Sequence, residues 1–178
     1  MPNLDYRSLI ALDSLMTTTT DQTDHVWKIA QKLKTCMLVT VSAGKIRSRP
    51  MHAMPDQETG YVWFITDHRG AKDGEIEAAP EVCLGFADTA SNTYLSMSGR
   101  AEMLRDIAKA RKLWSTETQA WWPKGPTDPD VRVVRVTPDS AEYWDARGNS
   151  VTVALKLVAA RLSGHPPDFG ENKKVRLR

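Results

Sequence analysis

The sequence predicts a mainly β protein, in which an antiparallel sheet closes into a barrel and short helices lie between the strands. Short apolar runs rich in Val, Ile, Leu and aromatic residues follow one another along the chain, separated by turns rich in Gly, Pro and Asp. Residues 93–104 alternate between apolar and polar side chains, as a half-buried strand does. Sequential strands favour antiparallel neighbours, and a long antiparallel sheet loses its edges by closing into a barrel.

Length and composition limit the possible classes of protein. The 178 residues suit one domain with a proper core. The net charge of +2 lacks the basic bias of a nucleic-acid-binding protein, and no run approaches the ~20 apolar residues of a membrane span. The two cysteines lack Cys-x-x-Cys spacing, which predicts a reduced, cytoplasmic protein. We therefore expect neither a nucleic-acid nor a membrane partner.

The first third of the chain is expected to hold a helix and three strands. Leu and Met residues before position 17 allow a short helix that the threonines at 17–20 then end, and residues 21–34 form a second helix. Residues 36–41, 45–54 and 61–66 are expected to form a three-stranded meander. Pro50 cannot donate to a strand ladder, which places its segment at an edge or a bulge.

The middle of the chain alternates between short helices and strands. Residues 70–79 form a helix that Pro80 stops, and residues 82–87 form a strand. Gly99, within the strand at 93–104, indicates a bulge or a close approach by another chain segment.

The end of the chain is expected to hold two helices, two strands and a tail. The helices occupy residues 106–114 and 117–122, and the strands at 131–136 and 140–145 flank a turn. Residues 164–178 are rich in Pro, Gly and charge, which predicts a mobile basic tail. The expected organisation is an N-terminal extension at 1–22, the barrel domain at 23–150 and a C-terminal extension with its tail at 151–178.

One hairpin carries the features of a phosphate site. In a strand, Arg47 and Arg49 share one face about 6.6 Å apart, from a rise of ~3.3 Å per residue. Ser48 and Thr66 supply hydroxyls nearby, and Lys72 falls in the first turn of a helix, where an anion would be stabilised. The alternative is a solvated edge strand with ordinary surface cations.

Several motifs resemble one known family. The first set is Gly44-x-x-Arg47-x-Arg49-Pro50-Met51, Phe64-Ile65-Thr66 with Lys72 after it, and Pro80-x-Val82. A second set is Ser98-Gly99-Arg100-Ala101-Glu102, Trp121-Trp122-Pro123-x-Gly125-Pro126-x-Asp128-Pro129 and Ala141-Glu142-Tyr143-Trp144-Asp145. In order and spacing they resemble the pyridoxamine 5′-phosphate oxidase-like FMN-binding split barrels, and the later motifs look like the bacterial general stress proteins of that family.

The resemblance implies an antiparallel split barrel and a homodimer with FMN in clefts between the protomers. It also implies that Lys72 binds the phosphate and that Trp144 reaches the flavin from the partner side. FAD would present a phosphate to the same residues. The cofactor-binding residues implied in this way are Arg47, Ser48, Arg49, Pro50, Met51, Ile65, Thr66, Lys72 and Trp144.

Three departures from the family pattern bear on activity. Ala71 stands where many oxidases carry Arg before the phosphate-binding Lys, and Tyr94 stands where they use Gln. The oxidases follow their Trp with an Arg-x-His-x-Arg segment that binds substrate, whereas residues 145–150 contain no His. The resemblance therefore argues against pyridoxamine 5′-phosphate oxidase activity.

The function indicated is an FMN-dependent oxidoreductase acting on a small molecule, in a stress response. Its substrate and catalytic residues are not identified by the sequence. The alternatives are a flavin carrier or sensor without turnover, and a split barrel that has lost FMN and binds another phosphorylated ligand. Trp121 and Trp122 could wall a substrate cleft, but the pattern favours core or interface packing. The four histidines show no metal-ligand spacing, so no metal is expected.

Overall fold

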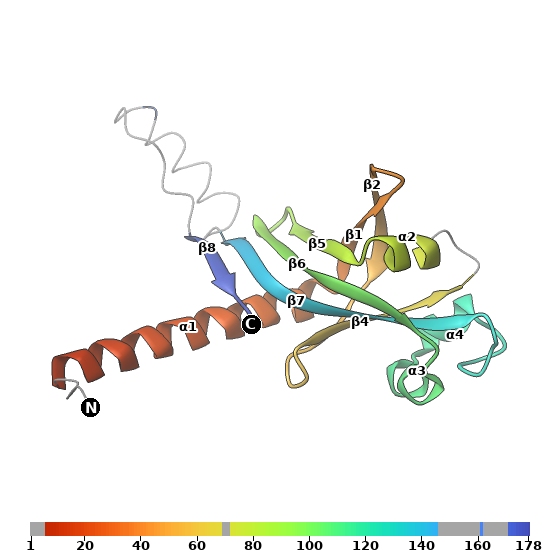
Figure 1. Ribbon diagram of the computed structural model, residues 1–178, viewed down its shortest axis with the longest axis horizontal. Helices are drawn as coiled ribbons and strands as arrows, with labels where there is room; N and C mark the ends of the chain where they lie inside the picture. Colours follow the sequence, from red (N-terminus) through yellow and green to blue (C-terminus); the bar gives the residue numbers. More distant parts are fainter. Residues whose placement is uncertain (1–5, 69–71, 146–160, 162–170) are drawn as a thin grey trace.

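The structure is a computed structural model that describes residues 6–68, 72–145, 161 and 171–178 (Figure 1). Residues 6–19, 72, 73 and 171 are described through their backbone alone. The elements are α1 (Tyr6–Leu33), β1 (Thr35–Ser42), β2 (Lys45–His52), β3 (Met54–Asp56), β4 (Tyr61–Asp67), α2 (Lys72–Ala78), β5 (Glu81–Asp88), β6 (Thr93–Leu104), α3 (Ile107–Leu113), α4 (Thr116–Trp121), β7 (Val131–Asp145) and β8 (Glu171–Arg176).

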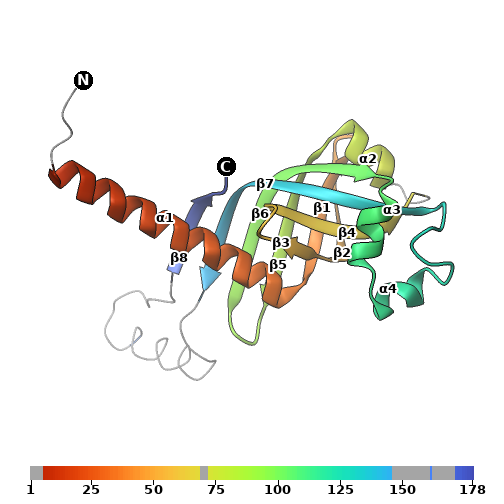
Figure 2. The same cartoon turned by 90° about the horizontal axis from the view of Figure 1, so that it is seen from below.

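The described strands form one antiparallel sheet of eight strands. Their order is β2-β1-β5-β6-β7-β4-β3, and β8 pairs with β7 off this path. The sheet curls around its apolar face, with α1 extending away from it toward the N-terminus (Figures 1 and 2). The prediction of a mainly β, antiparallel barrel is confirmed. The strands at the two ends of this path, β2 and β3, are consecutive in the chain, so the barrel is split between them.

The predicted meander is wrong at its second step. Strand β2 pairs with β1 along its whole length, but β4 pairs with β3 and β7 instead of β2. The chain changes from one sheet edge to the other at Ala53, whose amide N–H donates to the Lys34 carbonyl at 2.5 Å. Strand β4 carries apolar side chains on both faces, which favours an interior place in the sheet over one beside the polar edge strand. The edge position expected from Pro50 is confirmed for β2.

The longest pairing, between β6 and β7, contains the bulge that Gly99 predicted. The register shifts between Ser98 and Gly99, so that Ser98 faces Ser140 while Gly99 faces Pro138. A Cβ atom at Gly99 would lie 2.2 Å from the Thr137 carbonyl oxygen. The predicted turn at 137–139 is wrong, because β7 continues through it as the bulged strand.

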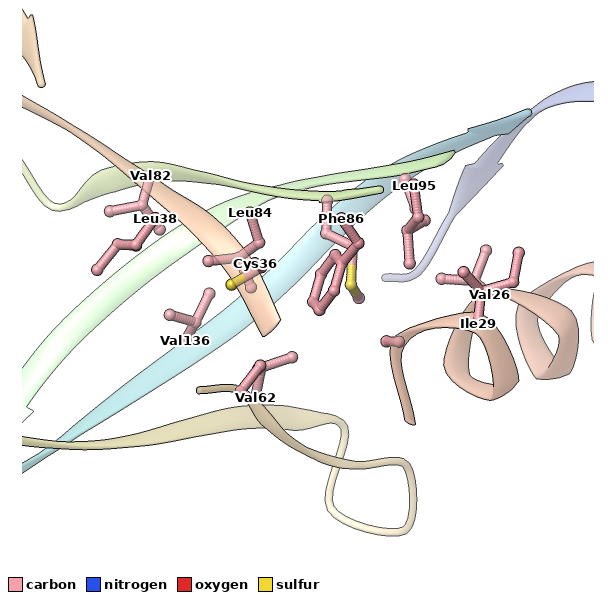
Figure 3. Packing of buried hydrophobic residues seen from close by; sticks show 14 of the residues in the cluster. Val26, Ile29, Cys36, Leu38, Val62, Val82, Leu84, Phe86, Leu95 and Val136 are labelled. Atoms are coloured by element: carbon pink, nitrogen blue, oxygen red, sulfur yellow. The ribbon is translucent and has the colours of Figure 1, made fainter. Parts of the chain in front are cut away.

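The main core fills the barrel and continues onto α1. The strands contribute alternate side chains such as Leu38, Leu84 and Met97, each at most 1 % exposed. Val26 and Ile29 of α1 close the cluster at one end (Figure 3). Strand β4 is buried on both faces, because Val62 and Phe64 face this core while Trp63 and Ile65 face a second cluster under α3.

Helix α1 is longer than expected. It runs without a break through the threonines at 17–20, so the predicted end there is wrong. Threonine disfavours a helix by at most about 0.7 kcal/mol per residue, which the packing of Val26 and Ala30 into the core can outweigh. The expected domain boundary at 22/23 falls inside this helix. None of the described helices is both long and apolar enough to cross a membrane.

The tail prediction is wrong for its last part. Residues Glu171–Arg176 form β8, which pairs with the end of β7 from Ser140 to Asp145. Val175 is 4 % exposed and belongs to the main core, which explains why this charged segment is held. The rest of the predicted C-terminal extension, residues 151–170, falls outside the described residues except at position 161.

Candidate functional site

A pocket of about 640 Å³ opens between the edge strand β2 and the end of β4, and helix α4 forms its outer wall. The pocket lies at the split of the barrel, where two strands that are not hydrogen-bonded to each other come close. Its lining residues are Thr35, Pro50, Met51, His52, Met54, Ile65, Thr66, Asp67, Ser115, Glu117, Thr118, Trp121 and Trp122.

Four of the nine predicted cofactor residues line this pocket: Pro50, Met51, Ile65 and Thr66. Met51 and Ile65 give the pocket apolar walls. Thr66, which is a buried residue, adds a hydroxyl group. The hairpin of the sequence prediction therefore brings its two strands to one cavity even though they do not pair.

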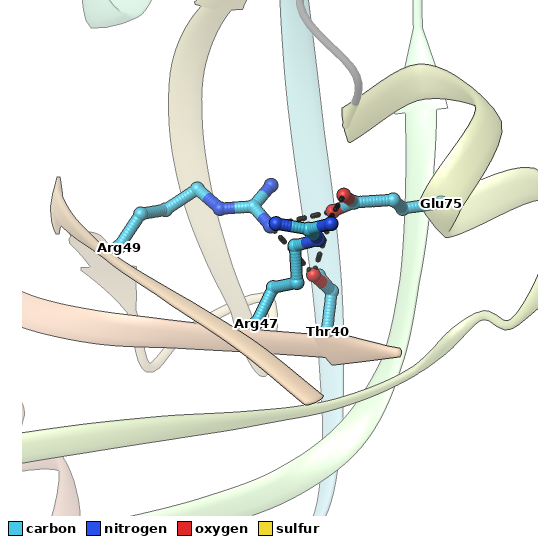
Figure 4. A network of polar contacts seen from close by, with 4 residues as sticks. All are labelled: Thr40, Arg47, Arg49 and Glu75. Carbon is cyan, nitrogen blue, oxygen red and sulfur yellow. Dashed lines mark hydrogen bonds and ion pairs between the residues drawn. The ribbon is translucent and has the colours of Figure 1, made fainter. Parts of the chain in front are cut away.

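The predicted arginines are not in the pocket lining but precede Pro50 and Met51 on β2, and they point to a buried carboxylate. Arg47 and Arg49 face inward with Thr40, as their alternation predicts, and converge on Glu75 of α2 (Figure 4). Arg49 Nη2 donates to Glu75 Oε2 at 2.5 Å and to Thr40 Oγ1 at 2.8 Å. Thr40 Oγ1 in turn donates to Glu75 Oε2 at 2.7 Å, and Arg47 Nε lies 3.9 Å from Glu75 Oε1.

The surroundings of Glu75 keep it charged. Burial on its own would raise the pKa of its carboxyl group. Hydrogen bonds from Arg49 and Thr40, with the charges of Arg49 and Arg47, outweigh burial and hold this pKa below its ordinary value. The carboxylate therefore offsets one of the two guanidinium charges, which leaves Arg47, Arg49 and Glu75 with a net positive charge.

Glu75 is a residue that the sequence prediction missed. Two arginines on an inward strand face need a counter-charge, because burying an unpaired charge is costly. The sequence offers three acidic residues in α2, namely Asp73, Glu75 and Glu77, without indicating which one turns inward. The fold determines which residue turns inward: Glu75 is buried, whereas Glu77 is exposed.

Ser48 is the predicted residue that is not brought to this cluster. Ser48 is exposed on the opposite face of β2, where alternation places it between Arg47 and Arg49. Lys72 begins α2, as expected for a first-turn lysine, but its side chain lies outside the described residues.

Trp144 lies far from the pocket within one chain. Thr66 pairs with Arg132, and Trp144 lies twelve residues farther along β7. At ~3.3 Å per residue this is roughly 40 Å along the strand. The Trp144 residue is 39 % exposed and stands opposite Tyr94 of β6.

Trp121 and Trp122 both line the pocket, which the packing interpretation did not predict. Trp122 also packs against the second core cluster, as that interpretation expected. Trp121 is 79 % exposed and presents its indole at the outer wall. Ser115 is the N-cap of α4, the helix that forms this wall. Its side chain accepts a hydrogen bond from the Thr118 amide and so stabilises the start of the helix.

The profile of one protein family matches most of this chain. The sequence profile of the family described as "Pyridoxamine 5′-phosphate oxidase like" matches residues 21–168. Among curated proteins, Protein bli-3 of Neurospora crassa is 24 % identical over 142 residues, which is 74 % of this chain and 68 % of that protein.

Solved structures share the fold over most of the chain. A protein of Jannaschia sp. CCS1, assigned as general stress protein 26, superposes with a TM-score of 0.73 and 27 % identity, over 88 % of this chain and 99 % of that one. The general stress FMN/FAD binding protein of Xanthomonas citri superposes with a TM-score of 0.64 and 26 % identity, over 71 % of this chain and 90 % of that one. The chain therefore belongs to the pyridoxamine 5′-phosphate oxidase-like family.

Proposed function

We propose that this chain binds FMN in the pocket between β2 and β4 and acts as a flavin-dependent oxidoreductase on a small molecule. Its place would be in a stress response, in line with the names of its structural relatives. The phosphate would lie at the side of the pocket where Arg49 and the start of α2 are found.

One observation carries the proposal. A cavity has apolar walls at Met51 and Ile65 and a hydroxyl at Thr66, and the strand that lines it also carries Arg49, whose guanidinium is already oriented. A flat apolar ring with a phosphate on a polar chain needs this pairing of surfaces. The residues present therefore fit the cofactor.

The protein and the cofactor would have different roles in the reaction. A bound flavin supplies hydride or electron transfer, while the protein supplies binding, orientation and exclusion of water. Met51 and Ile65 would pack on the ring system, and Arg49 and Lys72 would hold the phosphate. Trp121 and Trp122 would shape the open side, where a small substrate must enter.

A homodimer belongs to the proposal. The Trp144 side chain is partly exposed and lies too far along β7 to reach the pocket of its own chain. If it contacts the flavin, a second copy must supply it, as the family resemblance implies. The sites would then lie at the interface between the two copies.

The test is a titration of the purified protein with FMN and with FAD, followed by visible absorbance. We expect a flavin spectrum shifted from that of the free cofactor and saturation at one flavin per chain. A protein that leaves the spectrum of added flavin unchanged would contradict the proposal and favour another phosphorylated ligand.

Turnover is tested separately from binding. We expect the loaded protein to be bleached by a reduced nicotinamide cofactor without oxygen and to recover its colour on addition of an electron acceptor. Flavin that stays oxidised with every donor would favour the carrier or sensor alternative.

A further inference from the structure

We propose that Glu75 is a positioning residue that fixes Arg49 for a phosphate group and so makes the site prefer phosphorylated flavin to riboflavin. The inference rests on the proposed function for its ligand. Glu75 lies outside the pocket lining, and its substitution is expected to change the affinity for FMN.

The contacts of Arg49 leave single N–H donors of its guanidinium for a ligand. Both of its hydrogen bonds, to Glu75 and to Thr40, come from Nη2. Its Nε and Nη1 atoms have no hydrogen-bond partner among the residues that the structure describes. Each of these two nitrogens can donate an N–H separately to an oxygen of a phosphate. The Arg49 side chain is 21 % exposed, so these donors are within reach of solvent and ligand.

Arg49 also lies beside the proposed ligand. It shares a strand face with Met51 of the pocket lining, two residues farther along β2. The Cα atoms are about 6.6 Å apart, from a rise of ~3.3 Å per residue, and the guanidinium of Arg49 lies farther from Met51, at Thr40, which pairs with Arg47. A ligand with its ring against Met51 can therefore place a phosphate near Arg49.

Glu75 is suited to hold this guanidinium still. Its carboxylate is 4 % exposed and is tied to Thr40, itself 1 % exposed, so neither anchor moves freely. An arginine held by a buried partner has less side-chain entropy to lose when it binds an anion. Arg47 provides the contrast, because it is 60 % exposed and only approaches Glu75, at 3.9 Å.

Two effects of Glu75 on a bound phosphate have opposite signs. Its negative charge repels the phosphate, whereas its hydrogen bond orients the Arg49 donor. If repulsion dominates, removing the charge strengthens FMN binding. If orientation dominates, as we infer, removing it weakens FMN binding and leaves riboflavin binding unchanged, because riboflavin carries no phosphate.

The experiment measures the dissociation constants of FMN and riboflavin for the native chain, Glu75→Gln, Arg49→Ala and the double variant. We expect Glu75→Gln to weaken FMN binding about tenfold and to change riboflavin binding less than about twofold. In the Glu75→Gln background, Arg49→Ala should cost less than about threefold, because the guanidinium is no longer held.

Glu77→Gln is the matched control. Glu77 lies on the same helix and is exposed, so its substitution removes the same charge without touching Arg49. We expect it to leave both affinities within about twofold of the native values. If Glu75→Gln does not fold, Thr40→Val loosens the same network, and FMN binding alone should weaken.

Inorganic phosphate gives a readout that does not depend on flavin. At equal ionic strength with chloride, it should raise the thermal midpoint of the native chain and of Glu77→Gln, but not that of Glu75→Gln or Arg49→Ala. A native chain that responds to phosphate but not to FMN would overturn the proposed function and leave the role of Glu75 standing.

Three results would overturn the role of Glu75. The first is an FMN affinity that rises or stays unchanged in Glu75→Gln. The second is an equal loss of FMN and riboflavin affinity, which would indicate a structural effect. The third is a native chain that responds to neither FMN nor inorganic phosphate, which would overturn the proposed function as well.

Discussion

Thr40, Arg49 and Glu75 form a closed triangle of hydrogen bonds with lengths of 2.5 to 2.8 Å. Each member of the triangle satisfies another, so a carboxylate can stay charged inside the barrel. Removing one partner of a buried ion pair costs about 3–5 kcal/mol, because the remaining charge has no partner. The triangle is therefore a structural feature of the barrel as well as a support for Arg49.

The lowered pKa of Glu75 predicts an acid dependence of stability. A carboxyl group whose pKa is lower in the folded state adds stability above its unfolded value, for which 4.5 is the reference. That stability is lost as the pH falls through the folded pKa. Glu75→Gln should therefore unfold at lower urea concentration than the native chain at pH 7, and the gap should narrow below about pH 4.5.

Urea unfolding of the two proteins at several pH values from about 7 to 3 measures this gap. Glu77→Gln again serves as the control and should follow the native curve, since its side chain is exposed. A gap between native and Glu75→Gln that stays constant down to pH 3 would contradict the assignment of the charged carboxylate.

At the scale of elements, the bulge between β6 and β7 joins two halves of one long strand. Gly99 faces Pro138, and the residue after Pro138 has no direct partner in β6. The alternation along 93–104 and the position of Gly99 made this bulge predictable. The continuity of β7 was not, because Thr137, Pro138 and Asp139 are residues that turns also favour. Only the partner strand distinguishes a bulge from a turn.

Gly99→Ala should destabilise the fold strongly. The added Cβ would lie 2.2 Å from the Thr137 carbonyl oxygen and 2.7 Å from the Pro138 Cα, both backbone atoms that cannot rotate away. We expect the free energy of unfolding to fall by about 1–3 kcal/mol or more, as measured by urea unfolding. Gly85→Ala on the neighbouring β5 is the control, because nothing lies within 4 Å of its added Cβ. Equal effects at the two positions would contradict the close approach.

Two predictions at this scale are wrong because contacts between residues far apart in the sequence determine the structure. Local propensity ended a helix at the threonines of 17–20, but Val26 and Ala30 hold α1 to the core. The charge of the last residues indicated a free tail, but Val175 docks in the core as β8 pairs with β7. Neither anchor is visible in a short window of sequence.

At the scale of the whole molecule, the barrel is split between the consecutive strands β2 and β3, and the pocket lies at this split. The sequence predicted the antiparallel barrel and four of the residues that line this pocket. It did not predict that β2 and β4 lie on opposite sides of the split, because pairing across a closed sheet is not encoded in neighbouring residues. It also could not place Trp144, whose proposed role depends on a second copy.

A shared site predicts a dimer whose subunits complement each other. Light scattering should give a particle of twice the 19.9 kDa chain mass. We expect Arg49→Ala and Trp144→Ala each to bind FMN more weakly than the native chain. In dimers re-formed from an equal mixture, about one quarter of the sites should bind FMN with native affinity, because one site of each mixed dimer receives both native residues. Mixing Arg49→Ala with Glu75→Gln should give no site of native affinity, since both residues belong to the same side of the pocket. No recovery with Trp144→Ala would place the flavin contacts within one chain. Recovery in the control would show that the mixture does not report on a shared site.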